Sequence, residues 1–166
     1  SSDLKNELGR QYLFYFSMPC ALSTFVSYVS DVENSIWYSI ITLNFWLDHL
    51  LVVLVSLLML SARWFKPQKK YIPWVCLCIF IYFGVCFIAN LGLNGWQITG
   101  AHNHSYTMNP GGIMLLEPLY KLIPIPFVYL IPLLPLFALI FCLVALCFKN
   151  YKVVDSYNSQ IEINKN

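Results

Sequence analysis

The chain has 166 residues, of which 58% are hydrophobic and only 11% are charged. Soluble domains carry about 25% charged residues, so this composition excludes a soluble globular protein, which could not bury so much apolar surface. The net charge of +2 is too small to indicate a nucleic-acid partner, and we expect none.

Four apolar runs are each about as long as the ~20 residues that a helix needs to cross the hydrocarbon of a bilayer. None of them alternates strictly between apolar and polar residues as a barrel strand does, so we expect helices, whose backbone groups are satisfied within the segment. The predicted fold class is all-α, a polytopic membrane helix bundle with about four transmembrane helices. The runs cover residues 11–29, 36–60, 71–93 and 122–148.

The first run contains Pro19 followed by Cys20. A proline frees one backbone carbonyl and can kink a helix, so Cys20 is the cysteine that we keep as a candidate site residue. The other five cysteines lie inside the later runs, where we expect packing or lipid-facing residues and no disulfide framework. We recognise no signal peptide, because no small-residue cleavage site follows the first run.

The second run carries Asn44, Asp48 and His49 near its centre. A charged carboxylate at that depth costs about 2.5–3.5 kcal/mol on insertion scales, so it indicates a functional site. Asn44 and Asp48 share a helix face, whereas His49 lies about 100° round the helix, and we expect all three to face the bundle interior. Histidine exchanges protons near neutral pH, which makes His49 a candidate general base. The alternative is an interhelical hydrogen bond that holds the bundle together.

A short basic link, residues 61–70, precedes the third run, and a long polar loop, residues 94–121, follows it. Long ordered loops are usually functional, so Asn103 and His104 are candidate substrate-binding residues. The alternative is an interfacial cap over the bundle ends. The tripeptide that begins at Asn103 also matches the N-glycosylation pattern. Because the loop histidines are near the outer surface and His49 is about 15 Å deep, we expect no metal site.

The fourth run contains Pro132 and Pro135 in its interior. Each proline removes one backbone hydrogen bond, which leaves the carbonyls of Val128 and Ile131 without their usual donors. Since a free carbonyl in lipid needs a polar neighbour, we expect the outer half of this helix to line a cavity or to contact polar faces of other spans.

The basic residues are distributed unevenly across the predicted membrane. The positive-inside rule places both termini, the 61–70 link and the 149–166 tail in the cytoplasm, with the loops near 30–35 and 94–121 outside. We expect an integral multi-pass protein of a bacterial plasma membrane, or of an endomembrane if the chain is eukaryotic. Nine of the ten basic residues lie on the cytoplasmic side: Lys5, Arg10, Arg63, Lys66, Lys69, Lys70, Lys149, Lys152 and Lys165.

The second run contains an aromatic-x-x-His core within FWLDHLLVVLVSLLML, and the basic link follows it. The third run then ends in Asn90, and Pro110 follows Asn103 at a distance of seven residues. This order of features resembles the YwaF-like family, which includes animal transmembrane protein 164. The segment LLEPLYKLIPIPFVYLIPLLPLF is similar to the closing stretch of that family, and the likeness covers about residues 40–148.

That family is usually a six-helix bundle, and its animal members are implicated in transferring acyl chains between lipids. The resemblance implies that His49 is the family histidine, a general base or acid, with Asp48 nearby. The nucleophile of such relatives, a Cys or Thr, lies on earlier helices, whereas a single run precedes His49 here. Either N-terminal helices are missing from this chain or it is a shortened relative, and Cys20 is the candidate thiol.

The predicted function is therefore action on lipid acyl groups, by acyl transfer or ester hydrolysis. We expect His49, Asp48 and Cys20 to be catalytic, and Asn44, Asn103 and His104 to bind substrate, with no cofactor. The expected partners are membrane lipids, other membrane subunits or missing N-terminal helices. One alternative is a non-catalytic subunit or scaffold whose polar residues bind partner helices. Another is a transporter of lipids or small solutes, which a water-filled path from the outer loop to His49 would favour.

Overall fold

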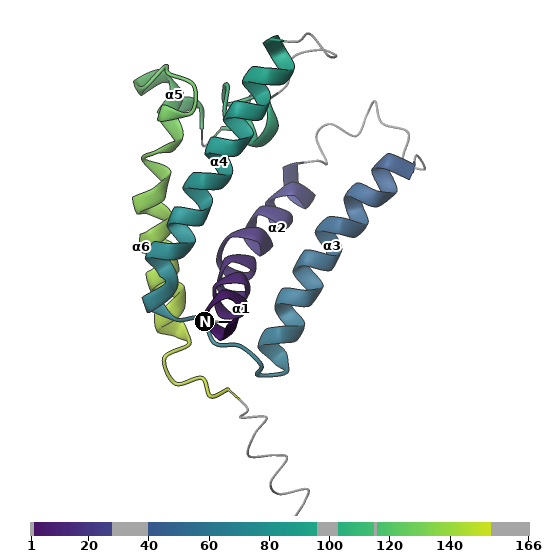
Figure 1. Cartoon of the computed structure of the whole chain (residues 1–166), viewed down its shortest axis with the longest axis vertical. Coiled ribbons are helices and arrows are strands. Elements are labelled where there is room, and N and C mark those ends of the chain that lie inside the picture. Colours follow the sequence, from purple (N-terminus) through teal and green to yellow (C-terminus); the bar gives the residue numbers. More distant parts are fainter. Residues whose placement is uncertain (1, 28–39, 96–102, 115, 154–166) are drawn as a thin grey trace, which may run out of the picture. The chain divides into compact units, whose positions relative to one another are not determined.

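A computed structural model describes residues 2–27, 40–95, 103–114 and 116–153, which contain helices and turns but no strands (Figure 1). The predicted all-α fold class is confirmed. The chain divides into two compact units: the first holds the residues up to Tyr71 and from Leu143 onward, and the second is Ile72–Cys142. The predicted outer loop near 30–35 and most of the predicted tail lie outside the described residues.

The first unit begins with a helical rod built from α1 (Ser2–Tyr12), a π-helical turn η1 (Leu13–Ser17) and α2 (Met18–Ser27). The flanking residues Tyr12 and Met18 keep α-helical backbone angles, so the rod continues through the wider turn. Pro19 explains the position of that turn, because a proline nitrogen cannot donate to the carbonyl four residues earlier.

Helix α3 (Ile40–Ser61) lies beside α2 and also contacts η1 (Figure 1). An aromatic cluster connects three segments of this unit, namely η1, the link after α3 and the segment after α6 (Leu133–Cys147). The ring of Phe14 on η1 lies 5.5 Å from the ring of Phe65 in the link after α3, and 6.0 Å from that of Phe148 in the segment after α6. Phe65 is 1% exposed, so this cluster is the core of the unit.

The second unit contains α4 (Ile72–Gly95) and most of α6. Its core is formed by Leu116, Tyr129, Leu130 and Leu133, against which Phe83 of α4 packs. The last turn of α6 belongs to the first unit. The elements in chain order are the 3₁₀ turn η4 (Lys69–Tyr71) that leads into this unit, α4 (Ile72–Gly95), η5 (His104–Tyr106), α5 (Glu117–Leu122), η6 (Val128–Leu130) and α6 (Leu133–Cys147).

Three stretches of the described chain are long and apolar enough to cross a membrane: Leu43–Ser61, Lys69–Gly95 and Val128–Cys147. They correspond to the second, third and fourth predicted spans. The first predicted span, residues 11–29, begins in the last two residues of α1 and continues through η1 and α2, and its own last two residues lie outside the described part.

The fourth predicted helix differs from expectation in its outer half. It was expected from residue 122, but the α-helix begins at Leu133, after a 3₁₀ turn. The carbonyl of Val128 accepts from the N–H of Ile131 (3.1 Å), and the carbonyl of Ile131 accepts from that of Leu134 (3.0 Å). The two carbonyls that the prolines free are thus satisfied by tighter local bonds, and the expectation of a cavity to satisfy them was wrong.

Candidate functional site

Helix α3 has a packed face and an exposed face, and its polar residues are split between them. His49 is half-buried and shares its face with Val53 and Ser56, which are buried at i+4 and i+7. Asn44 and Asp48 are both exposed. The expectation that all three residues face the interior was therefore wrong for Asn44 and Asp48, because the 100° step between neighbouring helical residues turns them away from the packed side.

The imidazole of His49 is held by the turn of α3 that precedes it. Its Nδ1 lies 2.7 Å from the carbonyl oxygen of Phe45, and the two ring centroids are 4.3 Å apart. A carbonyl oxygen can only accept a hydrogen bond, so Nδ1 carries the proton. In the neutral ring, Nε2 then has the free lone pair and is the nitrogen that can act as a base.

Cys20 lies on α2, directly after the π-helical turn and Pro19. Cys20 forms no disulfide within the described residues, the residue is exposed, and its backbone carbonyl accepts from the hydroxyl of Ser23 (2.8 Å). Since α2 and α3 contact each other, the structure brings the elements that carry Cys20 and His49 together in one unit. A π-helical turn inserted in an α-helix is often found at a functional site.

Asn103 and His104 belong to the second unit, whereas His49 belongs to the first. The Asn103 amide donates to the carbonyl of Asn109 (2.9 Å) and to its Oδ1 (3.0 Å), and Asn103 Oδ1 accepts from the N–H of Met108 (2.9 Å). Asn103 therefore closes the loop just before Pro110, which explains the seven-residue spacing in physical terms. His104 is the first residue of η5.

The loop after Asn103 lies along the outer half of α4. Ser105 Oγ is 2.6 Å from the hydroxyl of Tyr82 and 3.6 Å from Cys86 Sγ. Cys86 precedes the end of α4 at Gly95 by nine residues, which is about 14 Å along the axis at about 1.5 Å per residue. Non-helical backbone at such a depth is tolerated where protein or a polar cavity surrounds it.

A buried hydrogen bond fixes the same loop to α4. The side chain of Asn90 donates to the hydroxyl of Thr107 at 2.8 Å, and both residues are 0% exposed. The hydroxyl of Tyr129 donates to the carbonyl of Tyr106, and Phe127 N–H donates to the carbonyl of Thr107 (2.7 Å). The loop is thus attached on both sides, to α4 and to the segment that leads into α6.

A family model described as the TMEM164 family matches residues 4–153. The chain belongs to the TMEM164 family. The resemblance drawn from the sequence is confirmed, and the match covers most of both units. Together with the three apolar helices, it makes this TMEM164-family chain an integral multi-pass membrane protein. No curated protein matches the chain, and no solved structure does either.

The sequence analysis did not predict three structural features of this TMEM164-family chain. The π-helical turn had a signal in Pro19, which was interpreted only as a kink. The bond from Asn90 to Thr107 had a weaker signal, an amide inside an apolar run. The approach of Ser105 to α4 had none, because loop residues have no periodicity that predicts their partners. Within the described residues, no three His, Cys, Asp or Glu side chains gather closely enough to hold a metal ion.

Proposed function

We propose that this TMEM164-family protein acts on the acyl groups of membrane lipids, by acyl transfer or ester hydrolysis, with Cys20 as the nucleophile and His49 as the general acid and base. The observation that carries the proposal is the hydrogen bond from Nδ1 of His49 to the Phe45 carbonyl, at 2.7 Å. It fixes the orientation of the ring and leaves Nε2 as the proton acceptor. The acyl chemistry itself comes from the family resemblance, and Cys20 lies on the helix that contacts α3.

In the proposed reaction, Nε2 of His49 takes the proton of the Cys20 thiol, and the thiolate attacks the carbonyl carbon of a lipid ester. The ester C–O bond breaks, the acyl group is held as a thioester, and the leaving alkoxide receives the proton from His49. A second hydroxyl, from an acceptor lipid or water, then gives its proton to Nε2 and attacks the thioester. The Cys20 thiolate leaves and regains a proton from His49.

The test uses the full chain in phospholipid vesicles that contain a phospholipid with a labelled acyl chain and an unlabelled lysophospholipid. Loss of a general acid and base costs about 100-fold to 10,000-fold, so His49→Gln should lower the transfer rate by about 100-fold or more. Cys20→Ala should abolish transfer and also the labelled, hydroxylamine-sensitive thioester on the protein.

Cys147→Ala is the matched control for Cys20, because Cys147 is another exposed cysteine of the described chain. It should transfer acyl groups at the wild-type rate. Normal turnover by inserted His49→Gln or Cys20→Ala protein would contradict the proposed chemistry.

A second function is favoured by the exposure of Asn44 and Asp48 on α3. A carboxylate at that depth of a span needs a polar partner, which a helix of another membrane subunit supplies in the scaffold alternative. Under that alternative, Asp48→Ala disrupts a stable complex with another membrane protein, whereas His49→Gln does not. Under the enzyme proposal, isolated protein turns over lipid by itself.

A further inference from the structure

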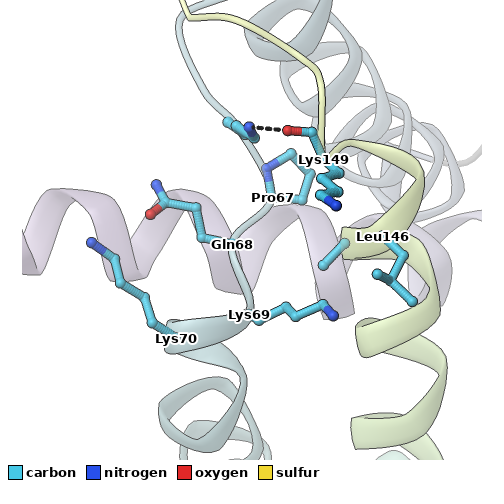
Figure 2. Close-up of a pocket in the computed structure, with 8 residues that line it drawn as sticks. Pro67, Gln68, Lys69, Lys70, Leu146 and Lys149 are labelled. Carbon is cyan, nitrogen blue, oxygen red and sulfur yellow. Dashed lines mark hydrogen bonds between the residues drawn. The ribbon is translucent and has the colours of Figure 1, made fainter.

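A cavity of about 490 Å³ lies in the first unit, between the basic link after α3 and the end of α6 (Figure 2). Two segments that are about 80 residues apart in the chain form its walls. Four lysines contribute to the lining, together with the apolar side chains of Ala145 and Leu146 and of a proline. The complete lining is Lys66, Pro67, Gln68, Lys69, Lys70, Ala145, Leu146 and Lys149.

The wall formed by the link is held in place by Gln11 of α1, whose side chain is fully buried. The Gln11 amide donates to the carbonyl of Lys66 (2.9 Å), and its oxygen accepts from the N–H of Gln68 (3.1 Å). Pro67 between them is buried. The backbone that carries the cavity lysines is therefore fixed by buried hydrogen bonds before any ligand arrives.

The two walls are also joined to each other. Lys66 Nζ donates to the carbonyl of Lys149 at 2.8 Å, and the hydroxyl of Tyr151 donates to the carbonyl of Leu60 at the end of α3. The bond from Lys66 gives a donor to the Lys149 carbonyl, which lies just beyond the C-terminus of α6. Without that donor, the partial negative charge at this end of the helix would repel an anion. Hydrogen bonds within the first unit therefore hold the two walls of the cavity together.

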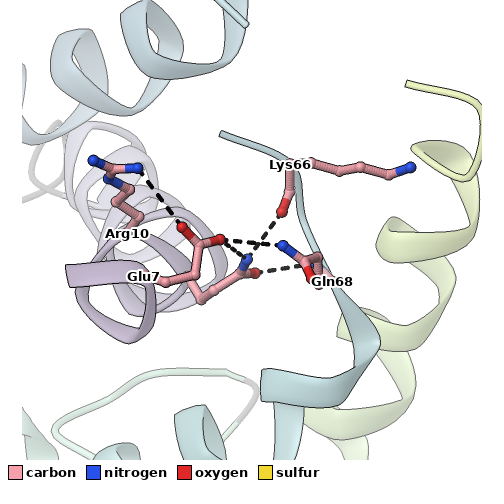
Figure 3. Close-up of polar contacts among 5 residues, drawn as sticks. Glu7, Arg10, Lys66 and Gln68 are labelled. Carbon is pink, nitrogen blue, oxygen red and sulfur yellow. Dashed lines mark hydrogen bonds and ion pairs between the residues drawn. The ribbon is translucent and has the colours of Figure 1, made fainter. Parts of the chain in front are cut away.

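The positive charge of the cavity has no counter-ion among the described residues. The carboxylate of Glu7 accepts from Gln11 and Gln68 and pairs with Arg10 at 3.7 Å (Figure 3). No carboxylate of the described chain forms an ion pair with a cavity lysine. An anion is therefore the ligand that this charge favours.

The four lysines are not equivalent. Lys66 is committed to the Lys149 carbonyl, and Lys70 lies 4.9 Å from the centre of the Tyr71 ring. Lys69 extends toward Leu146 of α6, whereas Lys70 extends away from it (Figure 2). Lys69 and Lys149 are both exposed, so they are the two ammonium groups best placed to contact a ligand.

The position of the cavity indicates the source of the anion. It lies where α3 and α6 end, on the side that the positive-inside rule assigns to the cytoplasm, whose leaflet carries anionic lipids. We propose that the cavity binds the headgroup of an anionic phospholipid, with Lys69 and Lys149 at its phosphate and with Ala145 and Leu146 against the glycerol and the first acyl carbons. A free phosphate would gain nothing from that apolar wall. This proposal does not depend on the proposed acyl chemistry.

The test is a lipid titration of the full purified chain in a non-ionic detergent, followed by native mass spectrometry. The probes are phosphatidylinositol 4-phosphate and phosphatidylcholine with the same acyl chains, and the soluble headgroup inositol 1,4-bisphosphate. The anionic lipid should bind more tightly than both others. Each lysine near an anionic surface contributes about 1 kcal/mol, about fivefold, so the double variant Lys69→Gln with Lys149→Gln should raise the Kd about 30-fold.

The matched control is the double variant Arg63→Gln with Lys152→Gln, which removes the same charge from exposed residues outside the cavity lining. Its Kd should change less than about threefold, since only the general surface potential differs. The conservative double variant Lys69→Arg with Lys149→Arg should bind as the wild type does.

Three results would overturn the proposal: equal losses in the two charge-removing double variants, equal affinity for the anionic and neutral lipids, or equal affinity for the lipid and its soluble headgroup. The last result identifies a site for free anions in place of lipid. Thermal unfolding of each variant checks the fold. If the double variant does not fold, the single variants Lys69→Gln and Lys149→Gln carry the test, each with an expected loss of about fivefold.

Discussion

Gly111 shows how one residue fixes the outer loop. Its φ of +58° lies in the left-handed region that favours glycine, and an added Cβ would lie 2.9 Å from Cδ1 of Tyr106. Its N–H donates to Oδ1 of Asn109 (3.0 Å), the side chain that also accepts from Asn103. The turn therefore needs both the backbone freedom and the missing side chain of glycine.

Replacement of Gly111 by alanine should lower stability by about 2–3 kcal/mol, because backbone strain and the clash with Tyr106 add. The measurement is the Tm of the full chain in detergent micelles. Gly112→Ala is the matched control, since Gly112 has a φ of +82° but nothing within 4 Å of an added Cβ. It should cost about 1 kcal/mol from strain alone. Equal Tm values for the two variants would show that the Tyr106 contact carries no energy.

At the scale of elements, the contact of α1 with the link after α3 depends on a single amide. Gln11 satisfies the Lys66 carbonyl and the Gln68 N–H, which are 55 and 57 residues away in the chain. The Lys66 carbonyl and the Gln68 N–H both lie beside buried Pro67, so water would not easily take the place of the Gln11 amide if that side chain were removed. A buried group that loses its partner costs about 1–3 kcal/mol.

Gln11→Ala should therefore destabilise the protein by about 2–4 kcal/mol, as the unpaired Lys66 carbonyl and Gln68 N–H add to the lost packing. Chemical unfolding in mixed micelles measures the difference. Asn6→Ala is the control on the same helix, because Asn6 is exposed, and it should change stability by less than about 0.5 kcal/mol. A similar small effect of Gln11→Ala would mean that the network in Figure 3 does not hold α1 to the link.

The sequence predicts helices whose bounds are set by the length of an apolar run. It does not predict elements whose bounds depend on contacts with other segments. The ends of α3 and α4 lie within two residues of the predicted spans wherever they are described, because a run of apolar residues directly sets the length of a membrane helix. The start of α6 was misplaced, since four prolines before Leu136 interrupt a run that is apolar throughout.

The candidate site was predicted with the same partial success. His49 was singled out because an imidazole is costly in an apolar run, and the structure places it on the packed face of α3. The outward position of Asp48 was missed, since helical spacing gives the angle between two residues but does not say which of them faces the neighbour. In the sequence, the cavity lysines indicate only the membrane topology, because the two walls of the cavity lie about 80 residues apart in the chain.

For the whole molecule, the uneven distribution of basic residues predicts the orientation in the membrane. Cysteine introduced at Lys152 should be labelled by a membrane-impermeant maleimide only from the cytoplasmic side, and cysteine introduced at Lys121 only from the outer side. Both residues are exposed. The measurement uses oriented vesicles of a variant in which the six native cysteines are replaced by alanine. Labelling of both positions from the same side would reject the predicted topology.

The bonds of Gln11 set an order for the biogenesis of the protein. The amide of Gln11 is synthesised before its acceptor, the Lys66 carbonyl, and its donor, the Gln68 N–H. Until the ribosome has passed that link, the nascent helix carries an unpaired polar group that translocation machinery or lipid headgroups must shelter. A stop in translation before residue 66 therefore leaves Gln11 without the two backbone partners that it has in the folded protein.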